Sequence, residues 1–160
     1  MNLINELGTL ALAARMQKLG DSIRREASQI YKEYGIEFES KWFPVVYLLS
    51  KQSPLSIVEL ANELGYAYPS IIALVKELQS KKIVKSASHK KDGRKWLLSL
   101  TPKAVDMVKK MEPLWDKMLQ VNNTITNNQH NLLKAIEQAE EQLAQESFYG
   151  RMQKLLKNKN

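Results

Sequence analysis

The fold is decided by the stretch LSIVELANELGYAYPSIIALVKELQSKKIVKSASHKKDGRKWLLSLTP, residues 55–102 of a 160-residue chain. Ser56 and Glu59 form an S-x-x-E capping box, which predicts the start of a helix. Gly65 supplies the left-handed residue that ends this helix. A second helix with apolar residues at three-to-four spacing follows at once, over residues 68–81. Two short helices joined by a tight turn containing glycine predict a helix-turn-helix.

A basic hairpin follows the second helix. Residues 83–88 and 96–100 have the composition of strands, and Asp92-Gly93 supplies the turn between them. Thr101 then caps a further helix, because a hydroxyl residue followed by proline favours a helix start. Two helices followed by a hairpin predict a winged helix-turn-helix, a mainly α fold with a small β-hairpin wing.

Helices are expected on both sides of this lobe. Apolar residues recur at helical spacing over residues 4–34, which predicts one long helix ended by a glycine, and over 40–49. Downstream, a helix is expected from Pro102 to about Val121, with Pro113 kinking or breaking it. A final single helix is expected over 132–155.

These elements fit a single domain, residues 1–160, with a DNA-binding lobe at 38–102. The flanks at 1–37 and 103–160 are expected to be helices that pair with a second copy, because the lobe alone cannot cover their apolar faces. The alternative is that they fold back on their own domain. No apolar run approaches the roughly 18 residues needed to span a bilayer, and the N-terminus lacks the basic start of a secretory signal. We therefore expect a cytoplasmic protein that makes no membrane contact.

The positive charge is concentrated in one short segment. The whole chain carries a formal charge of +7, with 24 basic and 17 acidic side chains. Residues 81–95, KKIVKSASHKKDGRK, hold seven basic residues against Asp92 alone, a net of +6. So local an excess favours a surface that binds a polyanion, and the alternative is a solvated loop.

In a winged helix, the second helix of the helix-turn-helix, called the recognition helix, enters the major groove of DNA. The hairpin reaches the flanking backbone or minor groove. The candidate DNA-contacting residues lie on that helix and in the hairpin: Tyr68, Ser70, Ala73, Lys76, His89, Lys90, Lys91, Arg94 and Lys95. We expect Asp92 to hold Arg94 or to cap the turn, and Gly93 to allow close approach to DNA. The first two helical turns contain no Arg, Asn or Gln, so sequence discrimination is expected mainly from the wing and from DNA shape. Ile72 either touches a thymine methyl group or belongs to the core.

Nothing in the sequence indicates an enzyme or a cofactor. His89 and His130 are far apart and lie in no metal-ligand spacing, and no phosphate-binding loop or nucleophile motif occurs. The absence of cysteine excludes a thiolate nucleophile and a thiol redox switch. One cluster of aromatic residues either lines a pocket for a small apolar effector or belongs to the core. Its members are Phe38, Trp42, Phe43 and Tyr47.

The stretch from Leu55 to Ala104 resembles the MarR family of transcription regulators. The capped helix, the K-E-L-x-x-K helix end, the D-x-R wing and the L-x-L-T-P exit match that family in order and spacing. The resemblance implies a homodimer that binds a pseudo-palindromic operator in double-stranded DNA and releases it when a small, often aromatic, ligand binds. It also implies wing roles for Asp92 and Arg94. The chain departs from the family at Ala67 and Ile72, where polar residues are usual.

The flanks of that stretch resemble a subgroup of the family that is sometimes fused to a GNAT acetyltransferase domain. The chain ends near Asn160, so no acetyltransferase domain is expected. Two other functions stay open at this point. The apolar recognition helix suits a protein-interaction module that has lost DNA reading. The basic wing suits an RNA-binding protein, although no aromatic stacking platform accompanies its charge.

Overall fold

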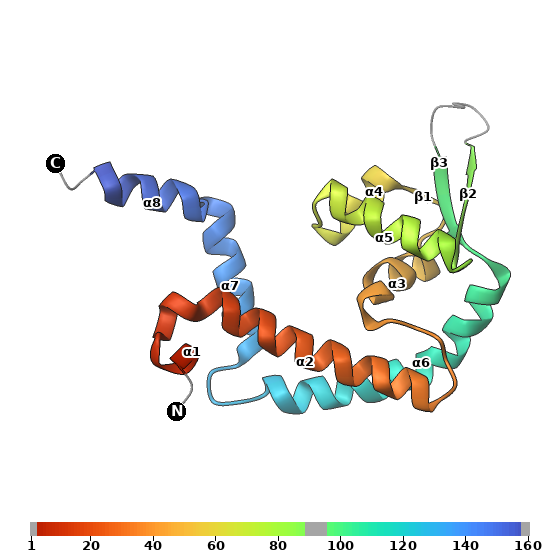
Figure 1. The fold of residues 1–160 in the computed structure, drawn as a ribbon, viewed down its shortest axis with the longest axis horizontal. Coiled ribbons are helices and arrows are strands. Elements are labelled where there is room, and N and C mark those ends of the chain that lie inside the picture. Colours follow the sequence, from red (N-terminus) through yellow and green to blue (C-terminus); the bar gives the residue numbers. More distant parts are fainter. Residues whose placement is uncertain (1–2, 89–95, 158–160) are drawn as a thin grey trace. The chain divides into compact units, whose positions relative to one another are not determined.

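The computed structural model describes residues 3–88 and 96–157, in two compact units, Met1–Leu114 and Trp115–Asn160. The first unit contains α1 (Leu3–Glu6), the 3-10 turn η1 (Gly8–Ala11), α2 (Leu12–Glu33), the 3-10 turn η2 (Ser40–Trp42), α3 (Phe43–Lys51), β1 (Leu55–Ser56), α4 (Ile57–Leu64), α5 (Tyr68–Ser80), β2 (Val84–Ser88) and β3 (Trp96–Leu100) (Figure 1). Helix α6 (Pro102–Thr126) begins in the first unit, and the second unit also holds α7 (Leu132–Gln145) and α8 (Phe148–Lys157). No helix among the described residues is long and apolar enough to cross a membrane.

Helices α4 and α5 form the predicted helix-turn-helix. The Ser56 hydroxyl accepts a hydrogen bond from the Glu59 amide at 3.2 Å, and a Glu59 carboxylate oxygen accepts one from the Ser56 amide at 2.7 Å. This is the reciprocal capping box that the sequence predicts. Gly65 ends α4 in the left-handed conformation, at φ 64°. Helix α5 begins after Ala67, which provides no side-chain cap.

The hairpin is part of a three-stranded antiparallel sheet with the order β1-β3-β2. Val84 pairs with Leu100 and Ser88 with Trp96, so the hairpin register spans both strands. Strand β1 was not predicted from the sequence, because a two-residue strand leaves no periodic pattern. It pairs Leu55 with Leu98 and so joins the start of α4 to the middle of the sheet.

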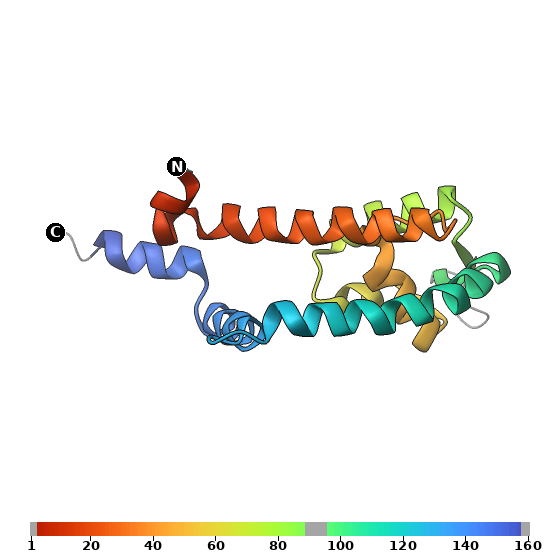
Figure 2. The same ribbon diagram turned by 90° about the horizontal axis from the view of Figure 1, so that it is seen from below.

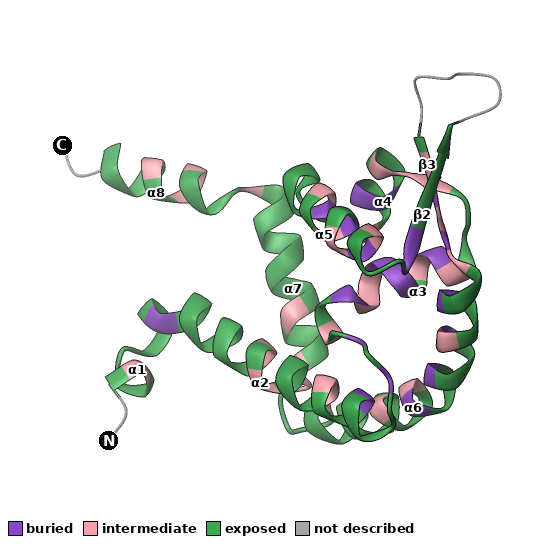
Figure 3. Cartoon of the chain, turned by 45° about the vertical axis from the view of Figure 1, so that its right-hand side comes forward, coloured by how far each residue is buried: buried purple, intermediate pink, exposed green. Residues whose placement is uncertain are grey.

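The core of the first unit lies where α3, α4 and α5 meet the sheet and the start of α6 (Figure 3). Its fully buried side chains are Tyr31, Val45, Val46, Leu49, Leu60, Ile71, Leu78, Leu98 and Met111. Thr101 joins α5 to α6 at the edge of this core. Its hydroxyl donates to the Lys82 carbonyl at 2.8 Å and accepts from the Ala104 amide at 3.2 Å. Thr101 therefore caps α6, as predicted.

The prediction of one long N-terminal helix over residues 4–34 was wrong. Gly8 adopts φ 55°, in the left-handed region that a right-handed helix cannot include, and the chain turns there through η1. Helix α2 starts only at Leu12 and ends at Glu33, followed by Gly35 at φ 68°. Figures 1 and 2 show the turn that precedes α2.

Of the two outcomes expected at Pro113, a kink or a break, the break does not occur. Helix α6 contains Pro113 and continues to Thr126. A proline inside a helix removes one amide donor and crowds the preceding turn. Met111 and Leu114 on either side of it are buried, so packing of the flanking residues holds the helix together at this point.

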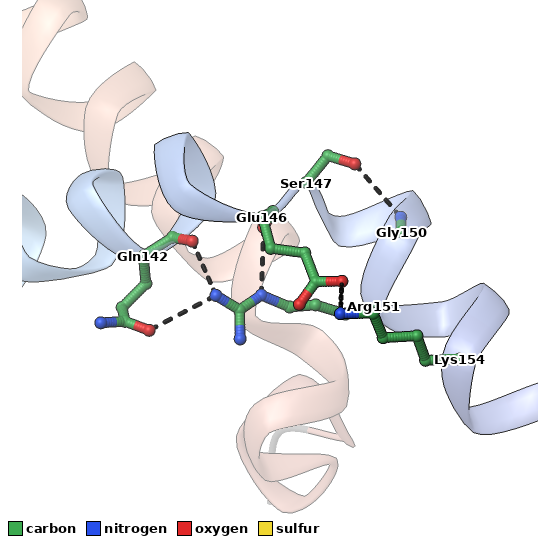
Figure 4. Close-up of polar contacts among 6 residues, drawn as sticks. All are labelled: Gln142, Glu146, Ser147, Gly150, Arg151 and Lys154. Atoms are coloured by element: carbon green, nitrogen blue, oxygen red, sulfur yellow. Dashed lines mark hydrogen bonds and ion pairs between the residues drawn. The ribbon is translucent and has the colours of Figure 1, made fainter. Parts of the chain in front are cut away.

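The single C-terminal helix predicted over residues 132–155 was also wrong. The chain is extended at Glu146, and α8 begins two residues later. Arg151 donates to the carbonyl of Gln142 at 2.7 Å and to that of Glu146 at 3.0 Å, so it satisfies the end of α7 (Figure 4). The Ser147 hydroxyl accepts from the Gly150 amide at 3.1 Å and caps α8. These polar contacts stabilise two helices in place of one.

Candidate nucleic-acid interface

Helix α5 presents one buried side and one exposed side. Ile71, Val75 and Leu78 are almost completely buried against the rest of the lobe. Ala73 and Lys76 lie on the opposite side of the helix and are exposed. Tyr68, at the first position of the helix, is 48% exposed. A helix held by an apolar stripe and open on its other side is the arrangement that a recognition helix needs.

A cavity borders this exposed side. It has a volume of about 510 Å³ and is open to solvent. Its lining residues come from α2, from η2 and α3, from the α4–α5 turn and from α5: Arg24, Ser40, Lys41, Phe43, Pro44, Tyr66, Ser70, Ala73, Leu74 and Glu77. Two of the residues expected to contact DNA, Ser70 and Ala73, therefore also form one wall of a cavity.

An ion pair closes part of the same cavity wall. The Lys41 ammonium lies 2.8 Å from a carboxylate oxygen of Glu77, with Lys41 half-exposed and Glu77 35% exposed. The hydrogen bond from Lys41 lowers the pKa of Glu77 below 4.5, partial burial opposes this, and the Trp42 indole adds to the lowering. Glu77 is therefore ionised at neutral pH, and its negative charge is balanced by Lys41 on η2.

A hydrogen bond between two side chains links the described part of the hairpin to α5. The Gln79 amide nitrogen donates to the Ser86 hydroxyl at 3.1 Å, which ties the end of α5 to the middle of β2. Ile72 is half-buried, between the core side and the open side of α5. Lys81, Lys82 and Lys85 are exposed around this junction. The described part of the basic segment thus lies beside the end of α5.

The remaining predicted wing residues lie outside the described residues. These are His89, Lys90, Lys91, Asp92, Gly93, Arg94 and Lys95. Their charge and their place in the sequence between β2 and β3 are the basis for the roles expected of them, and these roles stay predictions.

The aromatic cluster divides between the core and the cavity. Phe38 and Trp42 are buried, and Phe38 packs edge-to-face on Tyr31 at 4.9 Å and on Trp42 at 5.7 Å. Phe43 lines the cavity, whereas Tyr47 does not. Of the two alternatives, a place in the core is confirmed for Phe38 and Trp42, and only Phe43 of the four lines the cavity. Arg24, Lys41 and Tyr66 were not identified from the sequence, because residues from three distant segments meet at the cavity.

One further residue was assigned no role from the sequence. Trp96, the first residue of β3, is 58% exposed, whereas Leu98 and Leu100 on the same strand are buried. The alternation along Trp96-Leu97-Leu98-Ser99-Leu100 places Trp96 on the same face as Leu98 and Leu100, because residues two apart on a strand share a face, but it does not predict the exposure of Trp96. Trp96 therefore lies on the core face of the sheet at the point where the core has ended.

No protein-family model matches the chain, and no curated protein is significantly similar to it in sequence. Solved structures do match. A mutant of E. coli MarR complexed with operator DNA has a TM-score of 0.67 at 17% identity, covering 89% of this chain and 99% of that one. S. aureus MepR in a complex with DNA has a TM-score of 0.65 at 17% identity, covering 84% and 98%. PcaV from Streptomyces coelicolor, with its natural ligand, has a TM-score of 0.64 at 17% identity, covering 92% and 97%. The fold is therefore that of the MarR-type winged helix-turn-helix regulators.

Proposed function

We propose that this protein is a transcription regulator that binds double-stranded DNA through α5 and the basic hairpin. The observation that carries the proposal is the exposed side of α5, followed in the sequence by a segment of net charge +6, on a fold shared with two proteins solved as DNA complexes. Lysine and arginine side chains neutralise phosphates and supply most of the affinity for duplex DNA. A major-groove helix beside such a segment accounts for both features at once.

The residues divide into three groups by the contact they can make. Lys76 on α5 and Lys90, Lys91 and Lys95 suit phosphates. Arg94 suits the minor groove, whose negative potential favours a flat and weakly hydrated cation. Tyr68 and Ser70 carry hydroxyl groups at the start of α5, where a recognition helix meets base edges. We infer that α5 sets the position on the duplex and that the wing supplies most of the discrimination.

The proposal is tested by selecting bound duplexes from a random DNA pool and titrating the enriched sequence. Lys76→Ala and Arg94→Ala should each weaken binding, by roughly tenfold or more where the group reads bases. The matched control is Lys109→Ala, which removes an exposed lysine of α6 outside the lobe and should leave affinity unchanged. No enrichment, or equal affinity for all four proteins, would contradict the proposal and favour the protein-interaction module.

We propose further that the chain acts as a homodimer, paired through its terminal helices. Each unit leaves large apolar side chains exposed at these ends. In the first unit they are Leu3, Leu7, Leu10, Leu12 and Met16, and in the second Leu133, Leu143, Phe148, Tyr149 and Leu155. A second copy would remove this area from water. Light scattering at micromolar concentration should give twice the 18.4 kDa of one chain, and a monomeric mass would contradict the pairing.

The cavity beside α5 is proposed as the site of a small aromatic anion that controls DNA binding. Phe43, Pro44 and Tyr66 offer apolar contact. Arg24 and Lys41 carry positive charge, and a ligand anion would compete for them with their present partners, Asp21 and Glu77. A ligand here would touch Ser70 and Ala73 on the recognition helix itself. Benzoate should bind and weaken the DNA complex, whereas benzyl alcohol, which lacks the charge, should do neither. Binding of neither compound at millimolar concentration would contradict this assignment while leaving DNA binding untouched.

A further inference from the structure

The orientation of Trp96 follows from the register of the hairpin. Trp96 pairs with Ser88 and Leu98 pairs with Ser86, so these four residues share one face of the sheet. The hydrogen bond from Gln79 to Ser86 identifies this face as the one turned toward α5. Trp96 is therefore placed on the α5 side of the hairpin, one residue pair beyond that hydrogen bond.

The core does not extend as far as Trp96. Leu98 is 1% exposed on the same face, whereas the Trp96 side chain is 58% exposed. Tryptophan is the largest apolar side chain, and its indole also carries an N–H donor. More than half of this side chain is available to a partner, on the face of the hairpin that is turned toward α5.

The charge around Trp96 selects the partner. Lys76 is exposed on α5, and Trp96 directly follows the basic segment in the sequence. The acidic residue of α5, Glu77, is already paired with Lys41. A second copy of the same basic surface would be repelled here, whereas the sugar–phosphate backbone of DNA would be attracted.

We propose that Trp96 contacts the DNA backbone directly, with its ring against a deoxyribose and its indole N–H donating to a phosphate oxygen. The contact rests on the proposed function and adds an apolar component to an interface that is otherwise electrostatic. Amphipathic rings with a polar edge suit such a boundary between an apolar sugar and a charged oxygen.

The test compares Trp96→Ala and Trp96→Phe with the wild-type chain on the selected duplex, over a range of salt concentrations. Trp96→Ala should weaken binding about tenfold, and Trp96→Phe, which keeps a ring without the N–H, should weaken it less. The slope of log affinity against log salt should stay unchanged, because an indole displaces no counterion. Lys76→Ala should instead reduce that slope by about one. Tyr34→Ala is the control, because it removes an aromatic ring that is 65% exposed outside the lobe.

A second measurement can be interpreted even if Trp96→Ala lowers the stability of the protein. Acrylamide quenching of the wild-type chain minus that of Trp96→Phe isolates the fluorescence of Trp96, and bound duplex should protect it. Equal affinity of the wild-type chain and Trp96→Ala, or undiminished quenching with DNA bound, would overturn the contact while the proposed function stands. A change in oligomeric mass in Trp96→Ala would assign the ring to a second copy and also overturn it. Failure of the wild-type chain to bind any duplex would remove the proposed function as well.

Discussion

Lys41 and Glu77 connect the 3-10 turn η2 to the last turn of α5 through an ion pair of 2.8 Å. Both residues line the cavity beside α5, so the pair lies between the proposed effector site and the proposed DNA-binding side. A ligand carboxylate that attracts Lys41 would compete with Glu77. Through this ion pair, a ligand in the cavity would therefore change the position of α5.

The ion pair predicts a pH-dependent contribution to stability. Lys41 lowers the pKa of Glu77 in the folded chain. A carboxyl group whose pKa is lowered by folding stabilises the fold above its unfolded pKa, near 4.5, and this stabilisation is lost as the pH falls through the folded pKa. Glu77→Gln should thus destabilise at pH 7, by less than about 1 kcal/mol because the pair is partly exposed, and should cost nothing at pH 2.

Urea denaturation at the two pH values measures this effect. Glu112→Gln is the matched control, because Glu112 forms a longer pair of 3.4 Å with Lys51 and both side chains are half-exposed. Its effect at pH 7 should be smaller than that of Glu77→Gln. An equal loss for Glu77→Gln at both pH values would show that the ion pair is not the cause.

The capping box predicts how much stability the protein loses when the N-terminal cap of α4 is removed. Ser56→Ala removes the hydroxyl that accepts from the Glu59 amide and should cost about 1 kcal/mol of unfolding free energy. Ser56→Asp keeps an acceptor at this position and should cost less. Ser53→Ala, three residues earlier and exposed, serves as the control in the same denaturation series. No difference between Ser53→Ala and Ser56→Ala would contradict the role of the cap.

The end of α5 predicts a stabilising substitution. Lys82 has φ 56°, in the left-handed region. Its amide donates to the Gln79 carbonyl and the Ile83 amide donates to the Leu78 carbonyl. This is a helix C-terminal motif in which the left-handed position is usually glycine. Lys82→Gly should raise the free energy of unfolding by about 0.5–1 kcal/mol, because glycine adopts this conformation without strain. Lys82→Ala removes the same side chain without relieving the backbone and should not stabilise. A melting series of the three proteins decides the matter, and stabilisation by alanine would refute the backbone argument.

Arg151 predicts a local effect in the second unit. Its guanidinium group holds the last carbonyls of α7, and Arg151→Ala should leave them without this partner. We expect faster amide exchange over residues 142–157 and a small loss of helical circular dichroism. Arg151→Lys cannot reach both carbonyls with a planar fork and should recover only part of the loss. Unchanged exchange would mean that solvent satisfies these carbonyls equally well.

The sequence predicted the elements of the lobe correctly but not the bounds of the helices on either side of it, for physical reasons. The capping box at Ser56, the left-handed Gly65 and the cap at Thr101 are local signals, and the structure confirms each of them. The interruptions at Gly8 and Glu146 depend on backbone conformation and on contacts from Arg151 that helical periodicity does not record.

The candidate site was predicted only in part. The exposed side of α5 followed from periodicity, since Lys76 and Ala73 oppose the apolar stripe. The cavity needs Arg24, Lys41 and Tyr66 from separate segments, and no pattern along the chain brings these together. The exposure of Trp96 depends on where the core ends, which packing alone decides.

The salt dependence of duplex binding tests the central claim most directly. If a dimer contacts six to ten phosphates, its affinity for the selected duplex should fall roughly 10³- to 10⁵-fold between about 50 and 200 mM salt. Weak binding that does not respond to salt would contradict the account, because the basic hairpin would then not contact the phosphates of DNA.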